Sequence, residues 1–155
     1  PRMILMALPT PPGFEGIVPY TCCANAADAI AFYKEAFGAT EDFRIAAGDT
    51  IAHAELSLFG TKLMMSDPNH DYGAYAPSEI GGTPVTLHIY VDDVDAVLAQ
   101  AVKAGGTLAQ PAEDMFYGDR SGMIVCPAGH RWSLATHIED VSPEELQKRS
   151  KEIFG

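Results

Sequence analysis

Two stretches of the chain place apolar residues at the spacing of an α-helix, and each ends at glycine. Within residues 29–37 and 94–104, apolar side chains recur every three or four positions, which gives a helix one apolar side. Gly38 follows the first stretch, and Gly105 and Gly106 follow the second. Glycine commonly ends helices because it adopts a left-handed backbone conformation without steric cost. The pattern therefore predicts two amphipathic helices.

Extended segments surround both predicted helices in the same order. A β-rich run precedes each helix, at residues 17–23 and 85–91, and three more extended segments follow it, separated by turn residues. These segments are residues 40–47, 50–59 and 62–66 after the first helix, and 107–111, 121–126 and 130–137 after the second. Each half of the chain is therefore predicted to be a βαβββ module, and the fold class to be α+β.

The two halves also align when one is shifted by 67 positions, so that Gly38 coincides with Gly105 and Ser66 with Ser133. An internal repeat of this kind predicts two similar units that pack together. We expect a single domain over residues 1–155. It divides into module one at about 17–66, a linker at 67–84, module two at 85–137 and a C-terminal helix at 142–153, the last indicated by the capping sequence Ser-Pro-Glu-Glu.

Alternation along the strands assigns side chains to the two faces of each sheet. The apolar rows are Ala52, Ala54, Leu56 and Leu58 in module one, with Leu63 and Met65 on the neighbouring strand, and Leu87, Ile89, Val91, Trp132 and Leu134 in module two. These rows should pack against the helices. The opposite faces then form a concave surface that carries His53, Glu55, Met64, Thr86, His88, Tyr90, Arg131 and Ser133.

Polar side chains with apolar neighbours on a concave surface are typical of a small-molecule pocket. The candidate catalytic residues are His53, Glu55 and His88, because a histidine and a carboxylate can exchange protons with a substrate. The candidate ligand-binding residues are Met64, Thr86, Tyr90, Arg131 and Ser133. Arg131 would favour an anionic or strongly polar oxygen of the ligand, while Met64 and Tyr90 would supply apolar contacts. We expect all of these side chains to converge on one cavity.

Charge and cysteine content narrow the class of partner. The formal net charge is −11, with 21 Asp and Glu against 10 Lys and Arg, and the basic residues do not cluster. This balance argues against nucleic acid and membrane partners, and no apolar run approaches the roughly 18 residues of a membrane span. Three cysteines, with Cys22 and Cys23 adjacent, are more typical of buried thiols in a reducing compartment than of disulfides. We therefore expect a cytoplasmic protein.

Several motifs of the chain resemble those of a known superfamily. They are residues 31–39 (AFYKEAFGA), 51–56 (IAHAEL), 90–95 (YVDDVD), 117–120 (YGDR) and 127–137 (PAGHRWSLATH). With the paired modules, they are similar to the vicinal-oxygen-chelate superfamily, and within it to the PhnB-like, glyoxalase/bleomycin-resistance-like subgroup. The resemblance spans residues 17–146 and implies a concave pocket between paired modules. It also implies a homodimer, in which residues 1–16 would form an arm on the partner.

The resemblance indicates where a metal would bind in this superfamily. Metal-dependent members place one ligand, usually His, Gln or Glu, on the first and last strand of each module. The corresponding positions here are Val18 or Pro19, Met64 or Ser66, Thr86, and Ser133. None of these is an ordinary ligand of a divalent metal. We therefore expect no metal cofactor at the usual site of the superfamily.

Three roles for His53, Glu55 and His88 are consistent with the sequence. They could bind a divalent metal such as zinc, iron or manganese at a displaced site, perform acid–base chemistry without metal, or line the pocket through hydrogen bonds. The main prediction is a small-molecule-binding protein of the glyoxalase/bleomycin-resistance-like type. The alternatives are a lyase, isomerase or dioxygenase-type enzyme that uses these residues, and a non-catalytic interaction module, which the polar concave row disfavours.

Overall fold

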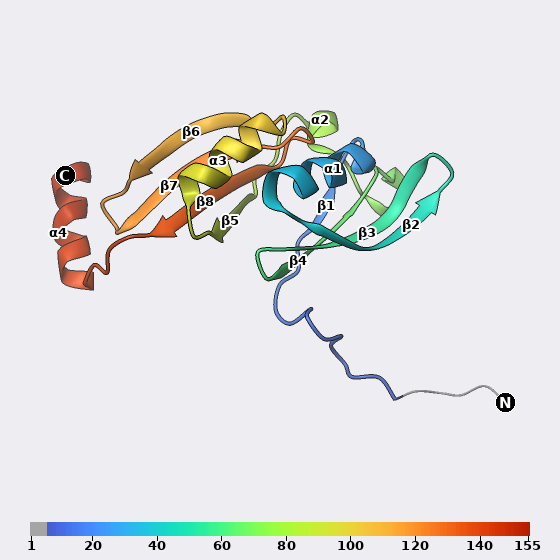
Figure 1. The fold of residues 1–155 in the computed structure, drawn as a ribbon, viewed down its shortest axis with the longest axis horizontal. Helices are drawn as coiled ribbons and strands as arrows, with labels where there is room; N and C mark the ends of the chain where they lie inside the picture. The colour runs from blue at the N-terminus through green and yellow to red at the C-terminus, as the bar shows by residue number, and fades with distance from the viewer. Residues whose placement is uncertain (1–5) are drawn as a thin grey trace.

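The computed structural model describes residues 6–155 and shows two four-stranded mixed sheets, each with one long helix on one face (Figure 1). Module one consists of β1 (Tyr20–Cys22), α1 (Ala26–Phe37), β2 (Thr40–Ala47), β3 (Thr50–Leu58) and β4 (Thr61–Ser66). Module two consists of β5 (Thr86–Tyr90), α3 (Val94–Lys103), β6 (Thr107–Asp114), β7 (Asp119–Val125) and β8 (Arg131–His137). The strand orders are β1-β4-β3-β2 and β5-β8-β7-β6. The predicted α+β fold of two βαβββ modules is confirmed.

Both long helices begin at a side-chain cap. The Asn25 side chain accepts the Asp28 backbone N–H at 3.3 Å, and the Asp93 side chain accepts the Ala96 backbone N–H at 3.1 Å. Such caps satisfy backbone donors that have no partner within the helix. At the other end of α1, Gly38 adopts the left-handed conformation that the sequence predicts, with φ of 66°. Local sequence thus fixes where these helices start and where the first one stops.

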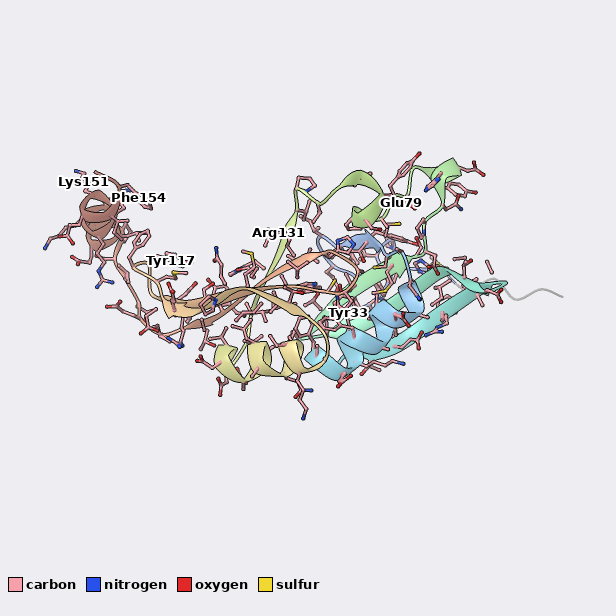
Figure 2. All side chains as sticks on the ribbon, turned by 90° about the horizontal axis from the view of Figure 1, so that it is seen from above. Tyr33, Glu79, Tyr117, Arg131, Lys151 and Phe154 are labelled. Carbon is pink, nitrogen blue, oxygen red and sulfur yellow. The ribbon has the colours of Figure 1, made fainter. Side chains whose placement is uncertain are left out.

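The two modules share one hydrophobic core. Helices α1 and α3 lie side by side on the same side of the molecule (Figure 2). The Trp132 ring of β8 packs against Tyr33 and Phe37 of α1, with ring centroids 5.5 and 5.2 Å apart. Trp132 also donates its indole N–H to the Tyr33 hydroxyl at 3.2 Å, and that hydroxyl donates to the Cys126 sulfur at 3.4 Å. These contacts join the last strand of module two to the helix of module one.

The buried cysteines act as small apolar side chains within this core. Cys23 and Cys126 are both buried and are not joined in a disulfide. Burial raises the pKa of the Cys23 thiol to about 12, so the reactive thiolate is scarce at neutral pH. This agrees with the interpretation of Cys23 and Cys126 as core residues, whereas Cys22 is only partly buried.

The strand faces follow the predicted alternation, with one correction. Ala54 and Leu56 of β3 are completely buried against α1, and Trp132 and Leu134 of β8 are buried in module two. The alternation places Ala52 in the buried row, but it is exposed. The register of β2 on β3 shifts here, because Ile45 pairs with His53 and Ala46 pairs with Ile51, which leaves Ala52 as a β-bulge. Ile51 is buried instead, where the Asp67 carboxylate from the following segment accepts its backbone N–H at 2.6 Å.

The predicted linker contains short helical elements that the sequence pattern did not indicate. They are a 3₁₀ turn, η1 (His70–Tyr72), and the one-turn helix α2 (Pro77–Ile80). His70 stacks on Tyr75 with ring centroids 4.4 Å apart, and its Nε2 lies 2.9 Å from Glu79. These contacts give the segment a defined path over the junction of the two modules.

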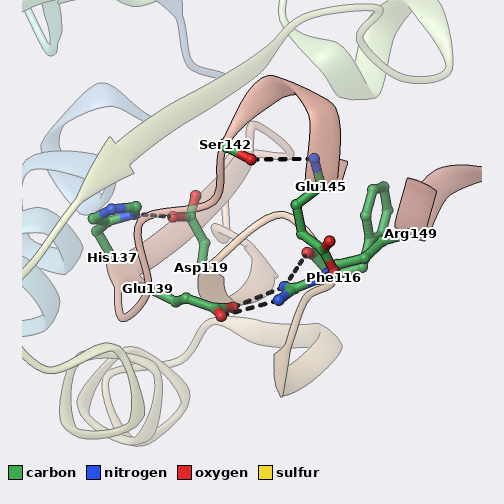
Figure 3. Close-up of polar contacts among 7 residues, drawn as sticks. All are labelled: Phe116, Asp119, His137, Glu139, Ser142, Glu145 and Arg149. Carbon is green, nitrogen blue, oxygen red and sulfur yellow. Dashed lines mark hydrogen bonds and ion pairs between the residues drawn. The ribbon is translucent and has the colours of Figure 1, made fainter. Parts of the chain in front are cut away.

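The terminal helix α4 (Pro143–Phe154) begins at the predicted capping sequence, where the Ser142 hydroxyl accepts the Glu145 N–H at 3.2 Å (Figure 3). Arg149 anchors the helix by donating to both carboxylate oxygens of Glu139, at 2.8 and 3.0 Å, and to the Phe116 carbonyl at 3.0 Å. No residue of α4 is buried, so the helix stands at the end of module two. Within residues 6–155, no helix is both long and apolar enough to cross a membrane.

Candidate functional site

Each sheet has one face that no helix covers, and we call these the open faces of module one and module two. On module one the open face exposes Tyr20, Phe43 and Ile45, by 54%, 51% and 47%. On module two it exposes Tyr90 by 56%. Large apolar side chains gathered on one side of a sheet mark a surface that contacts another molecule. Polar candidates lie between them, because Phe43 pairs with Glu55 and Ile45 pairs with His53 across β2 and β3.

On the open face of module one, three polar side chains form a chain of hydrogen bonds. The Tyr20 hydroxyl lies 2.7 Å from His53 Nδ1, and His53 Nε2 lies 3.1 Å from Glu55 Oε1. An ionised carboxylate can only accept, so Nε2 donates to Glu55, and Nδ1 of a neutral imidazole accepts the Tyr20 proton. Burial raises the pKa of Tyr20. A phenol, an imidazole and a carboxylate in series can pass a proton along their hydrogen bonds.

The alternation along β3 indicates His53 and Glu55, but no sequence pattern indicates Tyr20. Tyr20 reaches His53 because β1 pairs in parallel with β4, which places Tyr20 opposite Met64, and Met64 in turn lies opposite Glu55. Parallel pairing between the first and last strands of a module is a property of the assembled sheet. The face of the sheet on which Tyr20 lies could have been predicted only by assuming the register of β1 on β4.

On the open face of module two, a buried carboxylate joins two neighbouring strands. The Asp119 side chain is only 5% exposed and accepts from the Tyr90 hydroxyl at 2.7 Å. It also accepts from His137 Nδ1 at 2.8 Å (Figure 3). His137 Nε2 lies 2.7 Å from Asp140. Because ionised carboxylates only accept, this arrangement favours the imidazolium form of His137, in which both ring nitrogens donate.

The pKa shifts of this cluster follow from its hydrogen bonds. Burial raises the pKa of Asp119, but the hydrogen bonds from His137 and Tyr90 outweigh it and leave the pKa below its ordinary value. The hydrogen bond to Asp119 raises the pKa of His137 and also that of Tyr90. Asp119 and His137, which were not among the predicted site residues, face each other across β7 and β8. The spacing of the two residues in sequence gives no sign of this pairing.

Replacing Asp119 by asparagine should destabilise the protein more at pH 5.5 than at pH 9. Because the pKa of His137 is raised in the folded protein, protonation of His137 stabilises the fold. This stabilisation is complete below the ordinary pKa of about 6.5 and is lost as the pH rises through the raised pKa. The lowered pKa of Asp119 stabilises the fold above about 3.9, and this is lost as the pH falls through the lowered value. The Asp119–His137 pair therefore contributes most to the free energy of unfolding between about pH 4 and 6.5.

Urea denaturation at the two pH values measures this difference. Asp140→Asn is the matched control, because the Asp140 side chain is fully exposed and its loss should cost less at both pH values. Equal destabilisation by Asp119→Asn at pH 5.5 and pH 9 would show that the buried carboxylate does not hold the imidazolium.

The other candidates of module two lie together on the same open face. His88 Nδ1 is 2.9 Å from the Ser133 hydroxyl, and the His88 ring meets the edge of Tyr90 with centroids 5.0 Å apart. Thr86 pairs with Arg131 across β5 and β8. The Arg131 guanidinium donates to the Met123 sulfur at 2.8 Å. The structure therefore brings together Thr86, His88, Tyr90, Arg131 and Ser133 on one sheet.

The candidates of module one form a separate group within the chain. His53, Glu55 and Met64 lie on the first sheet, whereas His88 and Arg131 lie on the second. Among residues 6–155, no hydrogen bond joins the two groups. A cleft of about 430 Å³ does lie at the junction of the modules, lined by residues that include Tyr20, Cys22, Leu87 and His130.

His130 connects the two modules. Its Nε2 lies 2.8 Å from the carbonyl oxygen of Cys22, in the other module. The turn after β7 folds over the junction, so that its histidine meets β1. His130 thus helps to hold the two modules in a fixed relation.

The donor atoms do not suit the metal site that the resemblance implies. The side chains at the corresponding positions supply a thioether from Met64 and hydroxyls from Thr86 and Ser133, which are poor ligands for divalent metals. Within residues 6–155, no group of three or more His, Cys, Asp or Glu side chains could hold a metal ion. The displaced set of His53, Glu55 and His88 is divided between the two sheets of the chain.

Comparisons with known proteins agree with this fold. The model of the Glyoxalase/Bleomycin resistance protein/Dioxygenase superfamily matches residues 18–134. An uncharacterized protein of Mycobacterium tuberculosis is 40% identical over 133 residues, which cover 83% of this chain and 78% of that protein. The crystal structure of TioX from Micromonospora sp. ML1 is similar, with a TM-score of 0.65 and 26% identity over 79% of this chain and 98% of TioX. A PhnB protein from Bacillus cereus shares the fold, with a TM-score of 0.59 and 18% identity over 79% and 99% of the two chains.

Proposed function

We propose that this chain, which belongs to the glyoxalase/bleomycin resistance protein/dioxygenase superfamily, binds a small molecule in a pocket that two copies of the chain build together. The observation that carries the proposal is the pair of open faces. Each presents ordered polar side chains among half-exposed aromatic and apolar ones, such as Phe43 and Tyr90. One sheet face leaves most of a ligand in water, whereas binding pockets typically bury about 70–90% of its surface.

A second copy would complete both faces at once. Around a two-fold axis, module one of one copy would face module two of the other, and the same contact would repeat on the opposite side. This arrangement would set His53 and Glu55 against His88 and Arg131, so that the two groups of candidates converge between chains. It would also cover the half-exposed Tyr20, Phe43, Ile45 and Tyr90, each of which favours removal from water.

The N-terminal segment supports the same assembly. Within the described part of the predicted arm, residues 6–12 extend away from both sheets (Figure 1), whereas the Phe14 ring lies 5.3 Å from the Lys62 ammonium of β4. Residues 1–5 lie outside the described residues. Leu8 in this segment is exposed, as is Ile17 immediately after it. A proline-containing segment with apolar side chains, held away from its own core, is suited to lie along a partner.

One observation favours a second candidate function, which is acid–base catalysis without a metal. The hydrogen bonds from Tyr20 to His53 and from His53 to Glu55 give the proposed pocket a continuous path for a proton. An isomerase or lyase needs such a path to move a proton between substrate atoms. Binding alone requires only that these three side chains be hydrogen-bonded. The two candidate functions therefore differ in whether the protein releases its ligand chemically unchanged.

The oligomeric state tests the pocket directly. Sedimentation velocity at micromolar concentration should give the mass of a dimer for the unaltered chain and of a monomer for Phe43→Glu, because a buried unpaired carboxylate is costly. Val102→Glu is the matched control: Val102 is 44% exposed, comparable to Phe43 at 51%, but it lies on the helix α3. A monomer mass for the unaltered chain would contradict a shared pocket.

A ligand screen by thermal shift on the same variants tests the function. Compounds that bind the shared pocket should raise the melting temperature of the unaltered chain and of Val102→Glu, but not that of Phe43→Glu. Mass spectrometry of each recovered compound then separates the two candidates: an unchanged compound supports binding, and a converted one whose conversion is lost in His53→Gln supports acid–base catalysis. Compounds that stabilise all three proteins equally would place binding elsewhere.

A further inference from the structure

Among the arginines of residues 6–155, Arg131 differs from the others in its partners. Arg44, Arg120 and Arg149 each form an ion pair with a carboxylate. The hydrogen bond that Arg131 makes within the described residues goes to the sulfur of Met123, and a thioether is a weak acceptor. In a chain with 21 Asp and Glu, a guanidinium on an open face without a carboxylate beside it is notable.

The strands around Arg131 place only neutral side chains next to it on the open face. Across the sheet, Arg131 is level with Thr86 on β5, Val125 on β7 and Thr107 on β6. The next row of the same face consists of His88, Ser133, Met123 and Gln110. The first row supplies two hydroxyl groups, the second row supplies a hydroxyl, an amide and an imidazole group, and neither row contains a carboxylate.

The acidic residues of this face lie farther along the strands. Glu113 is level with Ser121 and Ala135, four residues from Arg131 on β8, which corresponds to roughly 13 Å at 3.3 Å per residue. Asp119 is level with His137, about 20 Å from Arg131 by the same spacing, and it already accepts two hydrogen bonds. The one positive charge at this end of the open face thus has no counter-charge nearby.

We infer that Arg131, labelled in Figure 2, recognises a carboxylate group of the ligand, an inference that rests on the proposed small-molecule pocket. A guanidinium offers two parallel N–H donors that match the two oxygens of a carboxylate. The hydroxyls of Thr86 and Ser133 stand beside it and add neutral donors. One cation with neutral donors balances one negative charge, which favours a monocarboxylate over a phosphate dianion.

The rest of the ligand should be apolar. Met123 and Val125 adjoin Arg131 on the same face, and Tyr90 lies farther along it. In the proposed dimer, Phe43 and Ile45 of the second copy would cover the ligand from the other side. Arg131 therefore orients an apolar carboxylic acid, with its charged end at the start of β8.

Isothermal titration with 1-naphthoate and its neutral counterpart 1-naphthamide tests the inference. The dimer should bind the carboxylate at least tenfold more tightly than the amide, and Arg131→Gln should abolish this preference. Arg131→Lys should restore part of it, because lysine keeps the charge but loses the two parallel donors. Arg120→Gln is the control, because Arg120 is engaged by Asp95 and Asp114 on the helix side.

The outcomes separate this inference from the function on which it rests. If both probes bind equally and Arg131→Gln changes neither affinity, the pocket stands and carboxylate recognition by Arg131 is overturned. If neither probe binds at millimolar concentration while the protein is a folded dimer, the proposed pocket is overturned together with the inference. If Arg131→Gln still binds 1-naphthoate more tightly than 1-naphthamide, a residue other than Arg131 recognises the carboxylate.

Discussion

Replacing Trp132 by alanine should lower the free energy of unfolding by about 3–5 kcal/mol, the range for removing a large aromatic side chain from a packed core. Trp132 is 4% exposed and packs against Tyr33 and Phe37 from the other module. Its removal also leaves the Tyr33 hydroxyl without its indole donor. Because domains are commonly stable by only about 5–15 kcal/mol, the variant should lose a large part of its stability.

Urea denaturation followed by circular dichroism measures this loss, since the variant lacks the tryptophan that fluorescence would need. Trp132→Phe should cost less, because it keeps a ring against α1 and loses only the indole N–H and part of the contact. Tyr72→Ala is the surface control, because Tyr72 is 88% exposed on η1. A loss of less than about 1 kcal/mol for Trp132→Ala would contradict the shared core, since that is the size of an ordinary point mutation.

The shared core matters for the pocket because it fixes how the two open faces are related. Each chain has to present both faces at a constant angle if a two-fold pair is to close two pockets at once. Trp132 of β8 joins the modules by contacting Tyr33 of α1, and His130, in the turn before β8, joins them by contacting the Cys22 carbonyl of β1. A weakened junction should therefore impair ligand binding as well as stability.

Much of this fold follows from patterns that are local in sequence. The spacing of apolar residues in α1 and α3, and the alternation that buries Leu56 and Leu134, depend only on the geometry of a helix or a strand. For this reason the modules and the open faces were predictable. The exposure of Ala52 was not predictable, because it follows from the β-bulge between β2 and β3, and no local pattern in the sequence reports such a shift of register.

For the candidate site, strand alternation predicts only the face of the sheet on which each side chain lies. His53, Glu55, His88 and Arg131 lie on the open faces as predicted, but apart from the contact between His53 and Glu55 their partners come from other strands. Tyr20 reaches His53 through the register of β1 on β4, and Asp119 meets His137 through that of β7 on β8. Strand register and the arrangement of two copies are properties of the assembled structure, and no local pattern in the sequence reports them.

Two binding-deficient variants should restore binding when they are combined, if each pocket is built from two chains. Met64→Asp on module one should repel a carboxylate, and Arg131→Gln on module two should fail to attract it. Each homodimer then has a defect in both pockets. In a mixed dimer, one pocket carries both changes and the other carries neither. Random pairing of equal amounts should therefore return about one quarter of all pockets to normal affinity.

Titration with 1-naphthoate after co-expression of the two variants measures the number of restored sites. The outcome depends on where the pocket is formed: a pocket built within one chain, or on one module, carries the same defect in any mixture, so binding would not return. Sedimentation of each variant alone has to show a dimer, because a change that prevents pairing would also prevent restoration. Mixing either variant with the unaltered chain gives the reference, in which every mixed dimer should keep one pocket of normal affinity. Restored sites with the affinity of the unaltered chain would therefore show that module one of one copy and module two of the other share a ligand.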